Sequence, residues 1–137
     1  MSVISVGTDL HRVGRFAAIL ARHGLTSPHV HRLAARVLHP DRELPEFVRA
    51  SKQSQLDTCT RALAHSWCVK EALYKTLDTP DQAAFAMRHW YKYNLANGRP
   101  HVASDSYTKH ERFLVSLSHD GDYVSSVVVR AKCTNEG

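Results

Sequence analysis

The sequence predicts a single α+β domain in which N-terminal helices, one of them long, pack on an antiparallel sheet. Three observations predict this class. Apolar residues recur at helical spacing through the first half of the chain, and the second half holds short β-type segments separated by turn residues. The 137 residues leave no room for two ordinary cores. Helices early and antiparallel strands late are typical of α+β domains.

The first half opens with a short apolar run, residues 3–7, which we expect to form a buried strand. Residues 12–23 place apolar side chains at helical spacing and are followed by a glycine, a favourable helix C-cap. A Ser-Pro pair predicts a second helix over residues 28–38, because proline favours the first helical position. A short third helix is expected near residues 41–49.

A long helix is expected over residues 57–77, with its N-cap at the first or second of them. Its apolar residues occupy one broad arc at 100° per residue. Lys70 falls inside this arc, which is unusual for a helix with only a structural role. Glu71 and Lys75 are four residues apart and lie together at one edge of the arc. The run W-x-x-K-E-x-x-x-K, residues 67–75, is therefore the most informative feature of the chain.

The second half changes to strand patterns, and Asn97-Gly98 is a strong hairpin signal. The elements expected there are strands over 88–95 and 99–103, a short helix over 105–112, a strand over 113–118, a turn over 119–122 and a valine-rich strand over 123–131.

Composition narrows the class of partner without choosing one. The net charge of +5 favours nucleic acid, anionic lipid, phosphorylated ligands or an acidic protein, but no run of five basic residues marks a nucleic-acid tail. No apolar stretch reaches about 18 residues, so we expect no membrane span, and we expect no signal peptide. Three cysteines without C-x-x-C spacing fit a reducing, intracellular compartment. The ten histidines form no typical four-ligand zinc set.

Three polar clusters together suggest Mg²⁺-dependent chemistry on a phosphorylated cofactor. Asp9 ends the run Val6-Gly7-Thr8-Asp9, Glu71 and Lys75 share a helix face, and Ser116-Leu117-Ser118-His119-Asp120 ends a later apolar run. Carboxylates suit Mg²⁺, and an ammonium suits phosphate.

Each cluster taken alone has a structural alternative. Asp9 could cap the first helix. Glu71 and Lys75 could form a surface ion pair that contributes about 0.3–0.5 kcal/mol. His119 could belong only to a hairpin turn.

The order V-G-T-D, K-E-A-x-x-K, N-G-R-P and S-L-S-H-D resembles the 4′-phosphopantetheinyl transferases of the short holo-acyl-carrier-protein synthase type, from Ile4 to Val129. The resemblance implies transfer of phosphopantetheine from coenzyme A to a serine of an apo-acyl carrier protein, with release of adenosine 3′,5′-bisphosphate. It also implies a possible homotrimer, no nucleic-acid or membrane partner, and a cytoplasmic location, or a mitochondrial one if the chain is eukaryotic.

The resemblance further implies roles for single residues. By similarity, Mg²⁺ would be held by Asp9 and Glu71. Catalysis would involve Glu71, Lys75 and His119, and coenzyme A would be bound by Lys70, Lys75, Ser118 and His119. The carrier protein would dock on Arg15 and Arg22, which are seven apart on the first helix.

Two positions depart from the family pattern. Ser66 stands where many bacterial members have arginine, and Arg12 stands where they often have glutamate. The segment from Arg36 to Glu43 resembles the family's R-x-L-[ST]-x-x-E, here with His39 in the fourth position.

Two other classes compete with the transferase hypothesis. A basic nucleic-acid-binding module could use Trp90, Tyr91 and Tyr93 as a stacking platform. A hydrolase could use Ser118-His119-Asp120, but neighbouring residues of a strand point in different directions and the chain has no G-x-S-x-G elbow.

Overall fold

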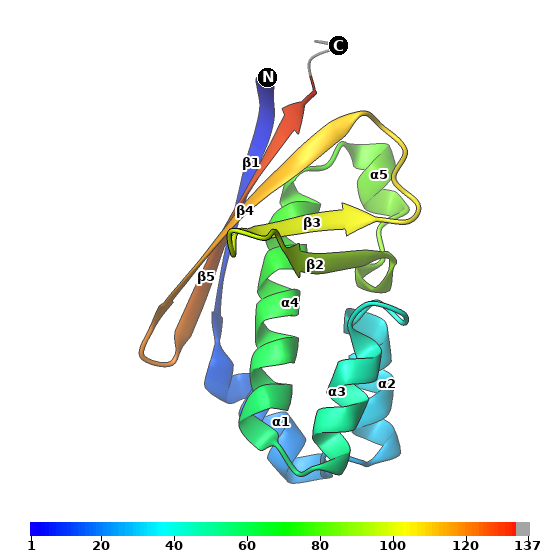
Figure 1. The fold of residues 1–137 in the computed structure, drawn as a ribbon, viewed down its shortest axis with the longest axis vertical. Helices are drawn as coiled ribbons and strands as arrows, with labels where there is room; N and C mark the ends of the chain where they lie inside the picture. The colour runs from blue at the N-terminus through cyan, green and yellow to red at the C-terminus, as the bar shows by residue number, and fades with distance from the viewer. Residues whose placement is uncertain (134–137) are drawn as a thin grey trace.

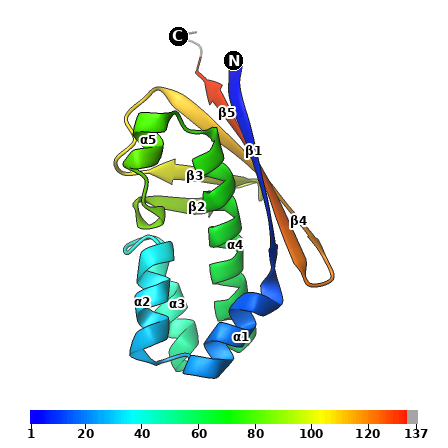
Figure 2. The same cartoon turned by 180° about the vertical axis from the view of Figure 1, so that it is seen from behind.

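The computed structural model describes residues 1–133, and they form five strands and six helical segments (Figures 1 and 2). The antiparallel sheet has the order β1-β5-β4-β3-β2. The predicted α+β class is confirmed. In chain order the elements are β1 Ser2–Arg12, α1 Val13–His23, α2 Pro28–Val37, α3 Leu44–Lys52, α4 Leu56–Thr76, α5 Thr79–Ala83, the 3₁₀ helix η1 Met87–His89, β2 Trp90–Asn94, β3 Pro100–Ser104, β4 Glu111–Asp120 and β5 Tyr123–Lys132.

Helix α4 is the axis of the molecule, and Figures 1 and 2 show it lying along the sheet with α1, α2 and α3 gathered around its N-terminal end. Its first half packs with these helices in one apolar cluster. Its second half packs with Trp90, Phe113 and Val128 of the sheet in another. Side chains on α4 therefore lie either within these cores or at the line where α4 meets β1.

Strand β1 crosses α4 at very close range. A Cβ atom on Gly7 would lie 2.0 Å from the carbonyl oxygen of Ala72, so only glycine permits this approach. Ser5 Oγ fixes the crossing by donating to the carbonyl of Thr76 at 2.6 Å. Because strand residues alternate in direction, Asp9 follows Ser5 and Gly7 onto the face toward α4.

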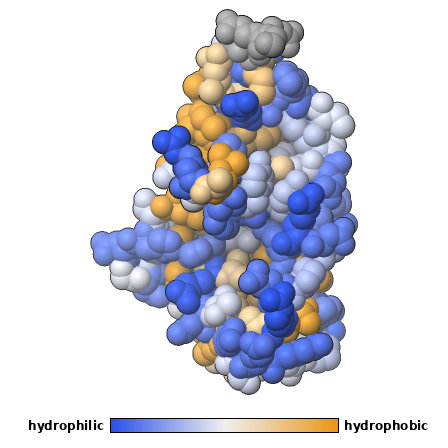
Figure 3. All heavy atoms as spheres, viewed as in Figure 1, coloured by the Kyte–Doolittle hydropathy of each residue, from blue (hydrophilic) through white to orange (hydrophobic). Residues whose placement is uncertain are grey.

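The other face of β1 and β5 carries exposed apolar side chains. Figure 3 shows apolar atoms gathered over the strip that these strands occupy in Figure 1. The exposed members on β1 and β5 are Val3, Ile4, Val6, Leu10 and Val127. None of the described helices is long and apolar enough to cross a bilayer.

Two expectations for the first half are corrected in extent. The strand expected over residues 3–7 is longer, because β1 pairs with β5 along its whole length, and it is mostly exposed, with Gly7 its one buried residue. Helix α4 begins at Leu56 after Gln55, so neither Asp57 nor Thr58 is its N-cap.

The helix expected over residues 105–112 is wrong. Ser104 Oγ accepts from the backbone N–H groups of Ser106 and Tyr107, which closes a local turn, and β4 begins at Glu111 opposite Lys132. The turn expected over residues 119–122 is shorter, because β4 continues to Asp120.

Candidate active site

The Asp9 carboxylate lies beside the Lys75 ammonium where β1 crosses α4. Lys75 Nζ donates to Asp9 Oδ1 at 3.2 Å and to the carbonyl oxygen of Thr8 at 2.7 Å. The Lys75 side chain is 49% exposed, whereas the Asp9 side chain is 14% exposed. The structure therefore brings these two predicted residues together at an open corner, which we call the Asp9–Lys75 corner.

Asp9 does not cap helix α1, so that alternative is wrong. Asp122, in the turn between β4 and β5, caps the helix instead. Its Oδ1 accepts from the N–H of Gly14 at 2.9 Å, and its carbonyl oxygen accepts from the N–H of Val13 at 2.8 Å. The Asp9 carboxylate is thus left free for the corner.

Glu71 lies one helical turn before Lys75, yet the structure records no ion pair between them among residues 1–133. Lys75 is turned toward Asp9. Both carboxylates act on the same buried thiol: burial chiefly raises the pKa of Cys68, and Asp9 and Glu71 each raise it further. Cys68 Sγ also contacts the Asp9 carbonyl oxygen at 3.6 Å. Glu71 lies one helical turn from Lys75, which contacts Asp9.

His11 belongs to this corner although the sequence analysis did not select it. Its Nε2 lies 2.6 Å from Asp9 Oδ2. Its ring makes edge contacts with Phe16 and Trp67, with ring centroids 6.2 Å apart in each case. The alternation of strand residues was a usable signal, because His11 is two positions after Asp9 and shares its face.

His119 lies on β4 opposite Val124 and points toward the N-terminal half of α4, where its ring centroid is 4.6 Å from that of His65. Burial lowers the pKa of His65 to about 4, and the nearby charges of His119, Lys92 and Arg61 lower it as well. His65 is therefore neutral near pH 7.

Ser118 pairs with Ser125 and is exposed on the opposite face of the sheet from His119. Within one chain the structure does not bring Ser118 and His119 to the same site. The same alternation separates the members of the hydrolase triad that was considered above.

Lys70 requires a correction, because its side chain is wholly buried and has no access to phosphate oxygens in this structure. Its Nζ donates to Glu43 Oε1 and to the carbonyl oxygen of Val37, each at 2.6 Å. Burial lowers the pKa of Lys70, and the Glu43 carboxylate opposes that shift. The helical arc placed Lys70 inside the molecule correctly, but the partner is a carboxylate of the same chain.

Glu43 joins its own loop to α4 and β2 through its two oxygens. Besides Lys70, it accepts from the backbone N–H of His39 at 2.9 Å and of Lys92 at 3.0 Å. His39 Nδ1 accepts from the N–H groups of Asp41 and Arg42, as a Ser or Thr oxygen would in this position. The Arg36–Glu43 segment is thus a structural connection in this chain.

Arg15 and Arg22 are both exposed on α1. Among the described residues no ion pair is recorded for either side chain. Neighbouring Arg12 lies over the ring of Tyr123, with its guanidinium carbon 5.6 Å from the ring centroid. The first helix therefore presents free positive charge to solvent.

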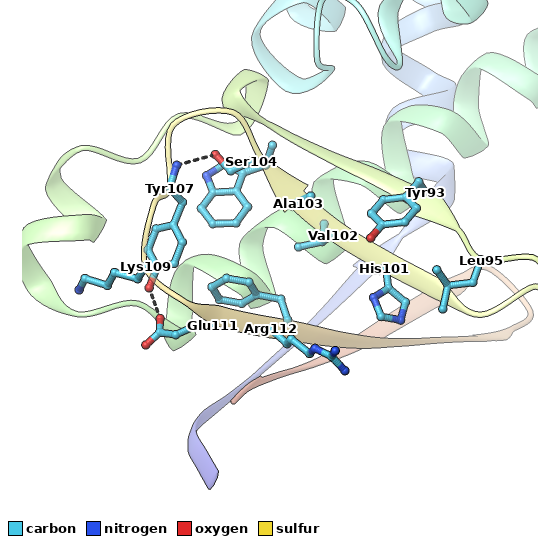
Figure 4. A pocket seen from close by; sticks show the side chains of 12 residues that line it. Tyr93, Leu95, His101, Val102, Ala103, Ser104, Tyr107, Lys109, Glu111 and Arg112 are labelled. Carbon is cyan, nitrogen blue, oxygen red and sulfur yellow. Dashed lines mark hydrogen bonds between the residues drawn. The ribbon is translucent and has the colours of Figure 1, made fainter. Parts of the chain in front are cut away.

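An aromatic-lined hollow lies elsewhere, where β3 and β4 diverge (Figure 4). Its volume is about 460 Å³, and no residue predicted for the site lines it. Figure 4 shows Tyr107 donating to Glu111, and Glu111 is also bound by the buried Arg130. This region fastens the C-terminal part of the sheet, and we assign it no part in the corner's chemistry.

The chain belongs to the 4′-phosphopantetheinyl transferase superfamily, whose family model matches residues 5–128. It is therefore a transferase, as the order of its motifs predicted. A mitochondrial holo-[acyl-carrier-protein] synthase of Eremothecium gossypii is 33% identical over 93% of this chain and 79% of that protein. A holo-[acyl-carrier-protein] synthase of Sodalis glossinidius is 34% identical over 73% of this chain and 69% of that protein.

The fold is also that of a solved holo-(acyl-carrier-protein) synthase from Bacillus anthracis in complex with CoA (3′,5′-ADP). That structure covers 97% of this chain and 100% of its own, with a TM-score of 0.71 and 19% sequence identity. At this identity the likeness concerns the fold.

Proposed function

We propose that this protein transfers the 4′-phosphopantetheine group of coenzyme A to a serine of an apo-acyl carrier protein and releases adenosine 3′,5′-bisphosphate. The observation that carries the proposal is the meeting of Asp9 and Lys75 beside Glu71 in an exposed corner. The holo-synthase names of the two relatives and the CoA bound by the Bacillus anthracis protein support the same donor and acceptor.

Asp9 and Glu71 fit a magnesium site by their chemistry. Among residues 1–133 no three His, Cys, Asp or Glu side chains cluster closely enough to hold a metal by themselves. Mg²⁺ commonly takes one or two carboxylates and fills its other positions with water and substrate phosphate, so two carboxylates suffice. When bound, the ion would stabilise charge that develops on the pyrophosphate oxygens.

The other residues of the corner would act on the substrates directly. Lys75 would pair with the phosphate of the leaving group, because its ammonium is half-exposed and can reach outward. Glu71, acting through a water molecule, would take the proton of the carrier serine. His119 would contact the cofactor from β4. Lys70 has no direct role in this proposal, because Glu43 occupies it.

Arg15 and Arg22 would dock the carrier protein, since carrier proteins of this family's reaction are acidic and both side chains are exposed. Arg15→Glu should raise the carrier KM at least several-fold, while coenzyme A binding changes little. Steady-state kinetics with each substrate varied in turn would measure this split. Unchanged carrier kinetics would mean that α1 is not the docking surface.

The exposed apolar face of β1 and β5 would be covered by further copies of the chain in a homotrimer, which would also turn Ser118 toward a neighbour. Light scattering coupled to size exclusion would give the mass of the assembly.

We further propose a mitochondrial or cytoplasmic location, because the relatives include mitochondrial and bacterial proteins.

The nucleic-acid alternative is weaker, because its three aromatic residues do not form an open stacking platform. Trp90 is buried in the core and cannot stack on a base, whereas Tyr91 is half-buried and Tyr93 is exposed. Arg42 already covers the Tyr91 ring, with its guanidinium carbon 4.6 Å from the centroid.

The direct test of the proposal is mass spectrometry of an apo-acyl carrier protein incubated with the protein, Mg²⁺ and coenzyme A. The carrier should gain the mass of one phosphopantetheine group, and EDTA should prevent the gain. No gain with several carrier proteins, with the enzyme shown to be folded, would refute the proposal.

A further inference from the structure

The contact between Asp9 and His11 leaves two buried polar atoms without a conventional partner. Asp9 Oδ2 and His11 Nε2 lie 2.6 Å apart, which is within hydrogen-bonding distance. Neither atom has another hydrogen-bond partner in the described structure. An unpartnered buried acceptor is unfavourable by roughly 1–3 kcal/mol, so a hydrogen bond between these two atoms is the arrangement that satisfies both.

The His11 ring is held in place by its aromatic neighbours. The ring meets Trp67 edge-on at an interplanar angle of 88° and Phe16 at 69°. Phe16 and Trp67 contact each other with centroids 6.0 Å apart, which closes a three-ring cluster. Trp67 begins the W-x-x-K-E run, so the aromatic residue of that motif acts on the corner through His11.

The two oxygens of Asp9 consequently face different surroundings. Oδ2 is buried against His11, whereas Oδ1 contacts the half-exposed Lys75 ammonium. A carboxylate held by one oxygen presents the other in a fixed direction. Hydrogen-bonded partners of this kind commonly change metal affinity 10–100-fold when they are removed.

We propose that His11 is a positioning residue that holds the Asp9 carboxylate, so that Oδ1 is presented to the metal and the pyrophosphate. This inference rests on the proposed function, because it assigns Asp9 to the metal. It needs an imidazole that donates from Nε2, and His11 itself would touch neither substrate nor metal.

The test compares two substitutions at one position. His11→Phe keeps an aromatic ring against Trp67 and Phe16 but removes the donor, and His11→Gln restores a donor N–H near the position of Nε2. Mn²⁺ binding to each variant is measured by the loss of the free-ion electron paramagnetic resonance signal, with coenzyme A present. His23→Phe is the matched control, because His23 is exposed at the far end of α1 and stacks on His29.

We expect His11→Phe to weaken Mn²⁺ binding about 10–100-fold, His11→Gln to recover at least a third of the lost affinity on a logarithmic scale, and His23→Phe to bind within about twofold of the unsubstituted protein. Thermal unfolding checks that each variant is folded. Full Mn²⁺ affinity in folded His11→Phe, or equal losses in His11→Phe and His11→Gln, would overturn the inference alone. If the unsubstituted protein binds no Mn²⁺, the inference and the proposed metal site fail together.

Discussion

Helix α4 carries two lysines that are both paired with carboxylates, yet the two pairs lie in different surroundings. Lys70 is fully buried, and its Nζ is 2.6 Å from Glu43 Oε1. Lys75 is 49% exposed, and its Nζ is 3.2 Å from Asp9 Oδ1. Five residues of helix turn the two side chains roughly 140° apart, so one enters the core and the other faces solvent.

The difference shows how one short motif serves both stability and chemistry. A buried ion pair whose groups are already hydrogen-bonded is not available to bind a substrate. Losing either partner leaves an unpaired charge inside the protein. An exposed pair contributes little to stability and can exchange its partner for a phosphate group. We therefore expect the Lys70 pair to support the fold and the Lys75 pair to support the reaction.

The largest expected effect is on stability at Lys70. Lys70→Met keeps most of the side-chain volume but leaves Glu43 without its cation, and should lower the free energy of unfolding by about 3–5 kcal/mol. Lys75→Met, the matched control, should lower it by no more than about 1 kcal/mol. Urea unfolding of both variants measures the contrast, and equal losses would remove the distinction between the two pairs.

The next effect is on the reaction rate at Lys75. Lys75→Met should reduce kcat/KM for phosphopantetheine transfer about 10²–10³-fold, since one donor to developing charge commonly contributes about 2.7–4 kcal/mol. The fold should be retained, as judged by circular dichroism. A Lys75→Met enzyme with nearly full activity would show that the exposed pair is only a surface ion pair.

A smaller effect concerns His65, which lies on α4 between the helical core and His119. Because its pKa is about 4 in the folded chain and about 6.5 when unfolded, the unfolded state binds more protons between these values. Stability should therefore fall as the pH falls from 6.5 to 4, by on the order of 1–3 kcal/mol, with no further loss from this group below pH 4. Unfolding at pH 7, 5 and 4 should show a weaker decline in His65→Gln than in the parent.

The smallest effect is at the helix cap. Asp122→Ala removes the acceptor for the Gly14 N–H and should lower the free energy of unfolding by about 1 kcal/mol. Asp120→Ala is the control, because Asp120 lies in the same hairpin and its side chain makes no recorded hydrogen bond among residues 1–133. A larger loss in Asp120→Ala would contradict the assignment of the cap.

Patterns within one element predicted most of the fold and part of the corner. Periodicity identified the helices and the shared edge of Glu71 and Lys75, and the Asn97-Gly98 pair identified the hairpin. These features depend on residues that are close together in the chain. It also placed Lys70 inside the helix arc. It did not show that Glu43, 27 residues earlier, meets Lys70 there, since partners so distant in sequence leave no local signal.

His11 and the helix expected over residues 105–112 illustrate the same limit. The role proposed for His11 depends on its ring contacts with Phe16 and Trp67. The contact with Trp67 arises because β1 crosses α4 at close range. Residues 105–112 have polar composition compatible with a helix, but Glu111 accepts from Arg130 of β5 and from the Tyr107 hydroxyl. Tertiary contacts determined both outcomes.

The central claim is that Asp9 and Glu71 act as one unit beside Lys75. The most direct measurement is a double-mutant cycle of phosphopantetheine transfer, with kcat/KM determined for Asp9→Ala, Glu71→Ala and the double variant. If both residues serve one metal ion, each single substitution should remove most activity and the double variant should be little worse than either single variant. Losses that multiply independently, in folded variants, would contradict a shared site.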